Sequence, residues 1–114
     1  MNRSELDSDV LLSMLKVLSD ETRLFIMKLL QSKEYCVCEL VEMFDMSQPA
    51  ISQHLRKLKQ NRLVIEARRG QWRYYSLNES HPGYDFVLSI LNQITDSDKL
   101  LQGILAREAE VSCK

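Results

Sequence analysis

The chain has 114 residues and a formal net charge of −1, with 45% hydrophobic and 27% charged residues. That length allows one domain with a single modest core, and the composition is typical of a soluble globular protein. No apolar run approaches the roughly 20 residues of a membrane-spanning helix, and the N-terminus opens into an acidic stretch rather than a signal peptide. We therefore expect a cytoplasmic protein without a membrane partner.

Basic residues are concentrated in one part of this nearly neutral chain. Seven of its fifteen lysines and arginines fall within residues 56–73, against a single acidic residue, Glu66. A basic stripe of this kind is typical of a nucleic-acid-binding surface, although a solvated helix face would give the same charge pattern.

The first half of the chain has apolar residues at helical spacing. They predict a first helix over about 6–18 and a second helix that Ser19 or Asp20 can cap. The second helix is apolar on most sides, so we expect it to be the central helix of the core. A third helix is predicted over about 37–44, and a fourth begins near Ser47 with Pro49 in its first turn.

Beyond the fourth helix the period of the pattern changes. Residues 63–67 and 72–77 are β-branched and aromatic, and Gly70 supplies a turn between them, which predicts a β-hairpin. A last helix is expected over about 84–106. We expect the aromatic residues of the hairpin to pack it onto the helices; stacking on single-stranded nucleic acid is a second interpretation.

This order of elements, ααααββα, is that of a winged helix-turn-helix, a mainly α fold with a β-hairpin. We expect one such domain over residues 1–107 and a flexible C-terminal tail over 108–114. The first and last helices have more apolar surface than so small a core needs, so we expect a homodimer formed through these two helices.

The second helix of a helix-turn-helix lies in the major groove of DNA, with its N-terminal residues at base edges. Gln and Ser in those positions suit base edges, and basic residues farther along and at the hairpin tip suit phosphates or the minor groove. We interpret His54 as a partly buried structural or phosphate-contacting residue rather than a metal ligand. The predicted contacts to double-stranded operator DNA are Ser47, Gln48, Ser52, Gln53, His54, Arg56, Lys57, Lys59, Arg68, Arg69, Gln71 and Arg73.

Two of the three cysteines, Cys36 and Cys38, lie at the start of the helix that supports the DNA-reading helix. An odd number of cysteines disfavours a disulfide scaffold and favours a ligand or redox role. Residues two apart on a helix point in nearly opposite directions, whereas two sulfurs that share a soft ion must lie within roughly 4 Å of each other. Ion binding is therefore expected to distort or unwind the first helical turn. The alternative is that both cysteines are small core residues.

Three stretches of the chain resemble the ArsR/SmtB family of metal-responsive repressors. They are residues 18–24 (LSDETRL), 34–40 (EYCVCEL) and 47–55 (SQPAISQHL), and the similarity continues to about Leu77. The stretch with the two cysteines is similar to the metal-binding motif of the arsenical repressors and of the cadmium/lead sensors.

The resemblance implies a dimeric winged-helix repressor that leaves its operator when As(III) or Sb(III) binds Cys36 and Cys38, with no catalytic cofactor. The chain has Val41 where the arsenical repressors have a third cysteine, so Cys113, solvent or a small-molecule thiol is the candidate third ligand. Residues 1–35 contain no cysteine of the kind that the cadmium/lead sensors use, and residues 82–114 contain no histidine of the kind that the zinc and cobalt sensors use.

Other hypotheses keep the same fold. A thiol-based sensor of oxidants or sulfur species is favoured by the position of the cysteines at a helix N-terminus, which lowers thiol pKa values, but a disulfide between residues two apart would be strained. A cadmium- or lead-responsive repressor and a DNA-binding protein without a ligand are further alternatives. An enzyme is not expected, because neither His54 nor His81 has a nearby nucleophile or paired-carboxylate pattern.

Overall fold

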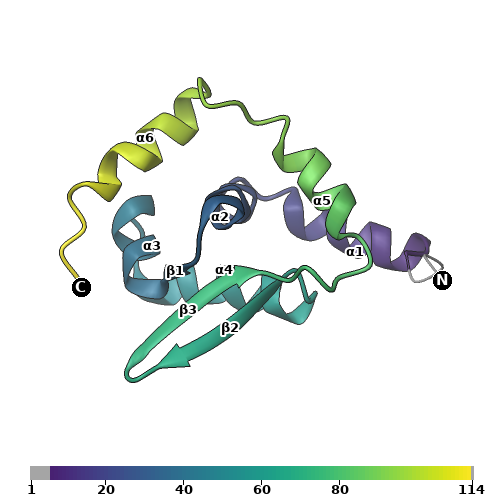
Figure 1. Ribbon diagram of the computed structural model, residues 1–114, viewed down its shortest axis with the longest axis horizontal. Helices are drawn as coiled ribbons and strands as arrows, with labels where there is room; N and C mark the ends of the chain where they lie inside the picture. The colour runs from purple at the N-terminus through teal and green to yellow at the C-terminus, as the bar shows by residue number, and fades with distance from the viewer. Residues whose placement is uncertain (1–5, 114) are drawn as a thin grey trace.

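Helix α2 lies at the centre of the fold in the computed structural model, which describes residues 6–113 (Figure 1). Its N-cap Asp20 accepts a hydrogen bond from the backbone N–H of Arg23 at 3.0 Å, and Ile26 and Leu29 are fully buried. Helices α1, α4 and α5 and strand β3 all pack against it, which confirms the expected central helix. In chain order the elements are α1 (Ser8–Leu18), α2 (Glu21–Ser32), β1 (Tyr35–Cys36), α3 (Val37–Phe44), α4 (Gln48–Gln60), β2 (Val64–Arg69), β3 (Trp72–Leu77), α5 (Tyr84–Leu91) and α6 (Lys99–Glu108).

Helices α3 and α4 form the helix-turn-helix. Helix α3 ends at Asp45, whose φ of 53° reverses the chain in the left-handed region. Ser47 then caps α4 by accepting a hydrogen bond from the backbone N–H of Ala50 at 3.3 Å, and Pro49 occupies the first turn, where no N–H is needed. The buried residues Ile51, Leu55 and Leu58 fix α4 on the core and leave its opposite face exposed.

The wing is an antiparallel hairpin of β2 and β3, as expected. Gly70 begins the two-residue turn with a φ of +61°, a conformation that glycine adopts without strain. The sequence did not predict the short strand β1, which pairs with β3 so that the sheet order is β1-β3-β2. Cys36 in β1 is the register partner of Tyr74, so the cysteine stretch belongs to the sheet of the wing.

The prediction of a single last helix over 84–106 is wrong, because this segment forms two helices, α5 and α6. The intervening residues include Thr95, Ser97 and Asp98, whose side chains compete with the helical backbone for hydrogen bonds. Asp98 caps α6 by accepting from the backbone N–H of Leu101 at 3.0 Å. Helix α6 turns away from α5 and packs on α3 (Figure 1), which carries the C-terminal tail towards the cysteines.

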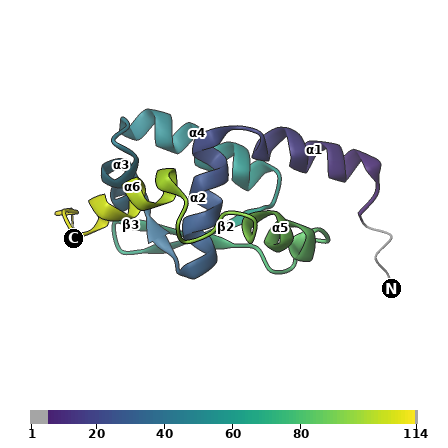
Figure 2. The same cartoon turned by 90° about the horizontal axis from the view of Figure 1, so that it is seen from above.

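The expected winged helix-turn-helix is confirmed by this arrangement, a mainly α fold with a β-hairpin. The two ends of the described chain lie far apart on its long axis (Figure 2). Within residues 6–113, no helix has the length and apolar character needed to cross a membrane. Several large apolar side chains on α1, α5 and α6 remain exposed in the single subunit: Leu12, Leu15, Phe86, Leu100 and Leu105.

Candidate functional site

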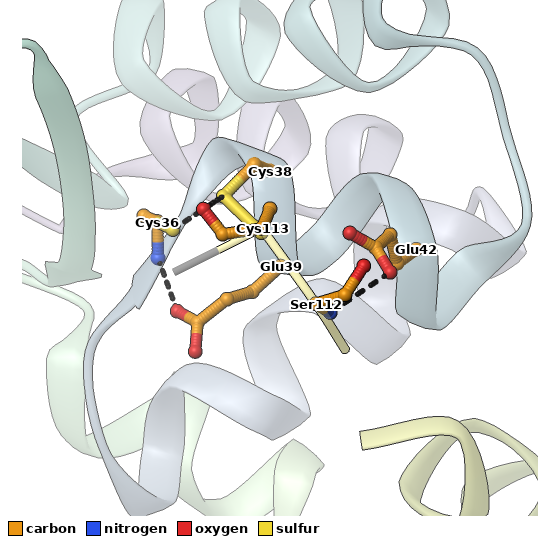
Figure 3. The surroundings of a disulfide bond; sticks show 6 residues. All are labelled: Cys36, Cys38, Glu39, Glu42, Ser112 and Cys113. Atoms are coloured by element: carbon orange, nitrogen blue, oxygen red, sulfur yellow. Dashed lines mark hydrogen bonds between the residues drawn. A yellow bond between two sulfur atoms is a disulfide. The ribbon is translucent and has the colours of Figure 1, made fainter. Parts of the chain in front are cut away.

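The three cysteine sulfurs lie together at the N-terminal end of α3 (Figure 3). The Sγ atoms of Cys36 and Cys38 are 3.1 Å apart, and Cys38 forms a disulfide with Cys113, with 6.2 Å between the two Cα atoms. All three sulfurs lie within 4.8 Å of one another. Of the candidate third ligands, the structure brings Cys113 to the other two cysteines.

Cys36 does not have the helical backbone that its motif was expected to adopt. It is the N-cap of α3, with extended angles of φ −89° and ψ 162°, and only Cys38 lies within the helix. Successive side chains within a helix are rotated by about 100° around its axis, but an N-cap residue does not have helical backbone angles and need not follow this rotation. The two sulfurs therefore approach each other without any change in α3. The expected unwinding of the first turn is therefore wrong in its premise.

The last described residues are held against α3 by polar contacts at two points. The guanidinium of Arg107 donates to the backbone carbonyl of Met43 at 2.8 Å, at the C-terminal end of α3, where a cation also suits the helix dipole. The backbone N–H of Ser112 donates to a carboxylate oxygen of Glu42 at 3.2 Å (Figure 3). Together with the packing of α6 on α3, these contacts place Cys113 beside Cys38.

Cys36 is the most deeply buried of the three cysteines. Its side chain is fully buried, and the carboxylate of Glu39 accepts a hydrogen bond from its backbone N–H at 2.8 Å. Burial raises the pKa of the Cys36 thiol, and the negative charge of Glu39 adds to this effect. The expectation that the helix N-terminus lowers the pKa is therefore wrong for Cys36.

Three soft sulfur donors form the candidate ion site, and neither histidine nor carboxylate is part of the cluster among the described residues. Sulfurs that share an ion with metal–sulfur bonds of about 2.3 Å lie no more than about 4.6 Å apart. The sulfurs of Cys36 and Cys38, 3.1 Å apart, lie within that range, and Cys113 is bonded to Cys38. Three thiolates leave structural zinc one ligand short and disfavour calcium and magnesium. The donor set therefore fits a thiophilic ion that forms three bonds.

The predicted base-reading residues lie at the exposed N-terminal part of α4. Gln48 and Gln53 are exposed and Ser52 is half-buried, whereas the hydroxyl of Ser47 is engaged in capping the helix. The predicted phosphate contacts lie farther along α4 and on the wing; all are exposed except Arg73, which is half-buried. They are Arg56, Lys57, Lys59, Arg68, Arg69, Gln71 and Arg73.

His54 is half-buried and joins α4 to the start of α2. Its Nδ1 atom lies 3.3 Å from a guanidinium nitrogen of Arg23 and 3.8 Å from a carboxylate oxygen of Asp20. Arg23 also donates from Nε to the carbonyl of Val17 at 2.7 Å. The arrangement supports a structural role for His54 in positioning α4.

Two acidic residues hold several of the basic residues predicted to contact DNA. Glu66 accepts a hydrogen bond from Lys59 of α4 at 2.6 Å and lies 3.8 Å from Arg73, and the bond from Lys59 lowers the pKa of Glu66. Glu34 makes a two-point contact with Arg69 at the wing tip. Part of the basic stripe therefore forms ion pairs with carboxylates rather than being simply exposed to solvent.

A hollow of about 280 Å³ joins the cysteine site to the DNA-reading face. Cys38 and Glu42 of α3 lie on one side, Gln48 lies at the start of α4, and Gln71 and Arg73 come from the wing. A change at Cys38 therefore occurs beside three residues predicted to contact DNA.

Sequence reasoning missed the residues that support these sites. Glu39 follows Cys36 by three residues, the spacing of a capping box, and this signal could have been recognised. Glu66 was visible as the one acid within the basic stripe. The contact of Arg107 with α3 depends on the break between α5 and α6, and no local pattern indicates it.

Comparison with known proteins gives the same assignment as the fold. Residues 20–66 match the model of a family described as "Bacterial regulatory protein, arsR family". The "Arsenical resistance operon repressor" of Staphylococcus xylosus is 42% identical over 87 residues, which are 76% of this chain and 82% of that protein.

Two solved structures extend the likeness to the fold. "Reduced HlyU from Vibrio cholerae N16961" is 28% identical with a TM-score of 0.70, and the match covers 85% of this chain and all of that one. A "Possible transcriptional regulator for arsenical resistance" is 35% identical with a TM-score of 0.59, covering 77% and 92% of the two chains. The chain belongs to the arsR family of bacterial regulatory proteins and is a DNA-binding transcriptional repressor, not an enzyme.

Proposed function

We propose that this repressor leaves its operator when As(III) or Sb(III) binds the thiolates of Cys36, Cys38 and Cys113. The observation that supports the proposal most directly is the position of all three sulfurs within 4.8 Å of one another, from segments 75 residues apart in the chain. The arsenical-resistance names of several relatives agree with this choice of inducer.

The chemistry of the proposed step is ligand exchange. Arsenite binds as As(OH)₃, three As–O bonds are replaced by three As–S bonds, and the three thiol protons leave with the hydroxides as water. This exchange changes no oxidation state, but it needs all three cysteines as thiols. The Cys38–Cys113 disulfide must therefore first be reduced, by exchange with two equivalents of a small-molecule thiol that is itself oxidised to a disulfide.

The position of the site suggests how ion binding reaches the DNA. Cys36 belongs to β1, which pairs with the wing strand β3, and Cys38 belongs to α3, which supports α4. An ion bonded to both sulfurs fixes the wing sheet relative to the helix-turn-helix, and Cys113 ties the α6 tail to the same point. We infer that the fixed arrangement disfavours simultaneous contact of α4 and the wing with DNA.

The remaining parts of the proposal follow from the family. The predicted base-reading and phosphate-contacting residues of α4 and the wing are the proposed contacts to double-stranded operator DNA. The exposed apolar side chains of α1, α5 and α6 are the proposed homodimer interface. A repressor acts where its operator is, so the protein is proposed to work in the cytoplasm.

Operator release by arsenite tests the proposed inducer. Fluorescence anisotropy of the reduced protein on its own upstream DNA should fall with micromolar arsenite and remain unchanged with equal zinc. Cys36→Ser and Cys38→Ser should bind DNA with unchanged affinity but require far more arsenite for release, whereas Ser112→Ala, a matched control beside Cys113, should respond as the wild type. Normal release of either cysteine variant would exclude the proposed site. Parallel titrations with cadmium and lead test the alternative inducers.

A second candidate function, redox sensing, is favoured by the disulfide between Cys38 and Cys113. The strain expected for a disulfide between residues two apart does not apply to this pair, which is separated by 75 residues. Two thiols would lose two electrons and two protons to a peroxide, which is reduced to water. If peroxide releases the DNA, dithiothreitol restores binding and arsenite has no effect on the reduced protein, redox sensing is the function instead.

A further inference from the structure

The arginine at the wing tip, Arg69, is held by a residue from outside the hairpin. Its guanidinium makes a two-point contact with the carboxylate of Glu34, with Nη2 and Oε1 3.0 Å apart. The same guanidinium lies over the ring of Tyr74, 4.6 Å from its centroid. Two-point pairing with a carboxylate and stacking on an aromatic ring together restrict a side chain that would otherwise sample many rotamers.

A phosphate would use the same atoms of Arg69 that Glu34 occupies. Arginine binds phosphate and carboxylate oxygens in the same forked geometry, so Arg69 cannot make both two-point contacts at once. Both side chains remain about half exposed, 55% for Arg69 and 41% for Glu34, so DNA could reach the guanidinium.

Glu34 also lies next to the cysteine site in the chain. It immediately precedes β1, in which Cys36 pairs with Tyr74 of β3. Arg69 therefore contacts the residue that precedes one strand of this pairing, Glu34, and the Tyr74 ring of the other strand. The contact joins the wing tip to the residue next to the strand that contains a proposed ion ligand.

We propose that Glu34 is a positioning residue that competes with operator phosphate for Arg69 and thereby lowers the DNA affinity of the protein. The competition itself needs only DNA binding; its link to the inducer through Cys36 rests on the proposed function. Occupancy of the site by an ion would hold β1 and with it Glu34 against Arg69.

A double-mutant cycle without inducer tests the competition. Operator affinity is measured by anisotropy, at two salt concentrations, for the wild type, Glu34→Gln, Arg69→Gln and the double variant. Because an exposed ion pair is weak, Glu34→Gln should bind DNA only modestly more tightly, by roughly threefold. In the Arg69→Gln background the same change should have no effect, since the competing partner is absent.

The cycle separates this proposal from a general charge effect and from a failure of the inducer hypothesis. Equal tightening by Glu34→Gln in both backgrounds would mean that Glu34 only repels DNA as a charge, and this would overturn the proposal. Unchanged or weaker binding by Glu34→Gln would overturn it as well. As a matched control, the cycle is repeated with Arg68→Gln in place of Arg69→Gln. Glu34→Gln should still tighten DNA binding in the Arg68→Gln background. These outcomes are measured without arsenite, so they do not depend on which ion the cysteines bind.

Discussion

At the residue scale, Cys113 changes a pair of neighbouring thiols into a three-sulfur cluster. The motif around Cys36 and Cys38 was evident from the sequence, but the geometry between them was not. A cysteine at an N-cap position and a cysteine two residues later lie 3.1 Å apart, whereas the same two residues inside a helix would diverge. The helix begins at Val37, as predicted, and the resulting N-cap position of Cys36 decides the chemistry.

The thiols of the reduced protein should differ in reactivity. Cys36 is fully buried and burial raises its pKa, so at neutral pH fewer Cys36 side chains are thiolates, the form that reacts. We predict that iodoacetamide modifies Cys36 several times more slowly than Cys38 or Cys113, as measured by mass spectrometry of peptides over time. In urea the three rates should become similar. Fastest modification of Cys36 in the folded protein would contradict its burial.

At the scale of elements, the core helices and the hairpin were predictable because their periodicity is local. The second helix, with buried Phe25, Ile26 and Leu29, was identified as the centre of the core, and Gly70 correctly located the turn of the wing. The two-residue strand β1 was not predictable, because it exists only through pairing with β3. The apolar spacing of α5 and α6 continued across the polar residues between them, so the two helices were predicted as one.

The contact between α4 and the wing gives a prediction about acid stability. The hydrogen bond from Lys59 lowers the pKa of Glu66 below its usual 4.5, so ionised Glu66 stabilises the folded state above that pH. The stabilisation disappears as pH falls through the lowered pKa. Glu66→Gln should therefore lower the urea midpoint by about 0.3 M near pH 6 and by less near pH 3.

Circular dichroism during urea unfolding measures both midpoints. Glu79→Gln, which removes an exposed carboxylate beyond the wing, is the control and should change neither midpoint. A loss for Glu66→Gln that is equally large near pH 3 would show that the carboxylate charge is not responsible.

At the scale of the whole molecule, the subunit exposes apolar side chains that a partner would cover. Leu12 on α1 is 59% exposed and Phe86 on α5 is 37% exposed. The sequence indicated the excess of apolar residues but not which side chains remain exposed, because burial depends on how the helices pack against one another. The division into a domain over 1–107 and a flexible tail over 108–114 stays a prediction.

A charge placed in the proposed interface should separate the subunits. Leu12→Glu should shift the molar mass measured by light scattering from dimer to monomer and weaken operator binding more than about tenfold, because a dimer binds two half-sites together. Ser13→Glu adds the same charge about 100° around α1 and should leave the dimer intact. A monomeric wild type, or a Leu12→Glu dimer, would place the interface elsewhere or remove it.

Arsenic K-edge X-ray absorption of the reduced protein loaded with one equivalent of arsenite tests the three-sulfur site most directly. The wild type should show three sulfur neighbours around arsenic, and Cys113→Ser should show two sulfurs and one oxygen. Two sulfurs in both proteins would contradict the central claim, because Cys113 would then lie beside the site without being part of it.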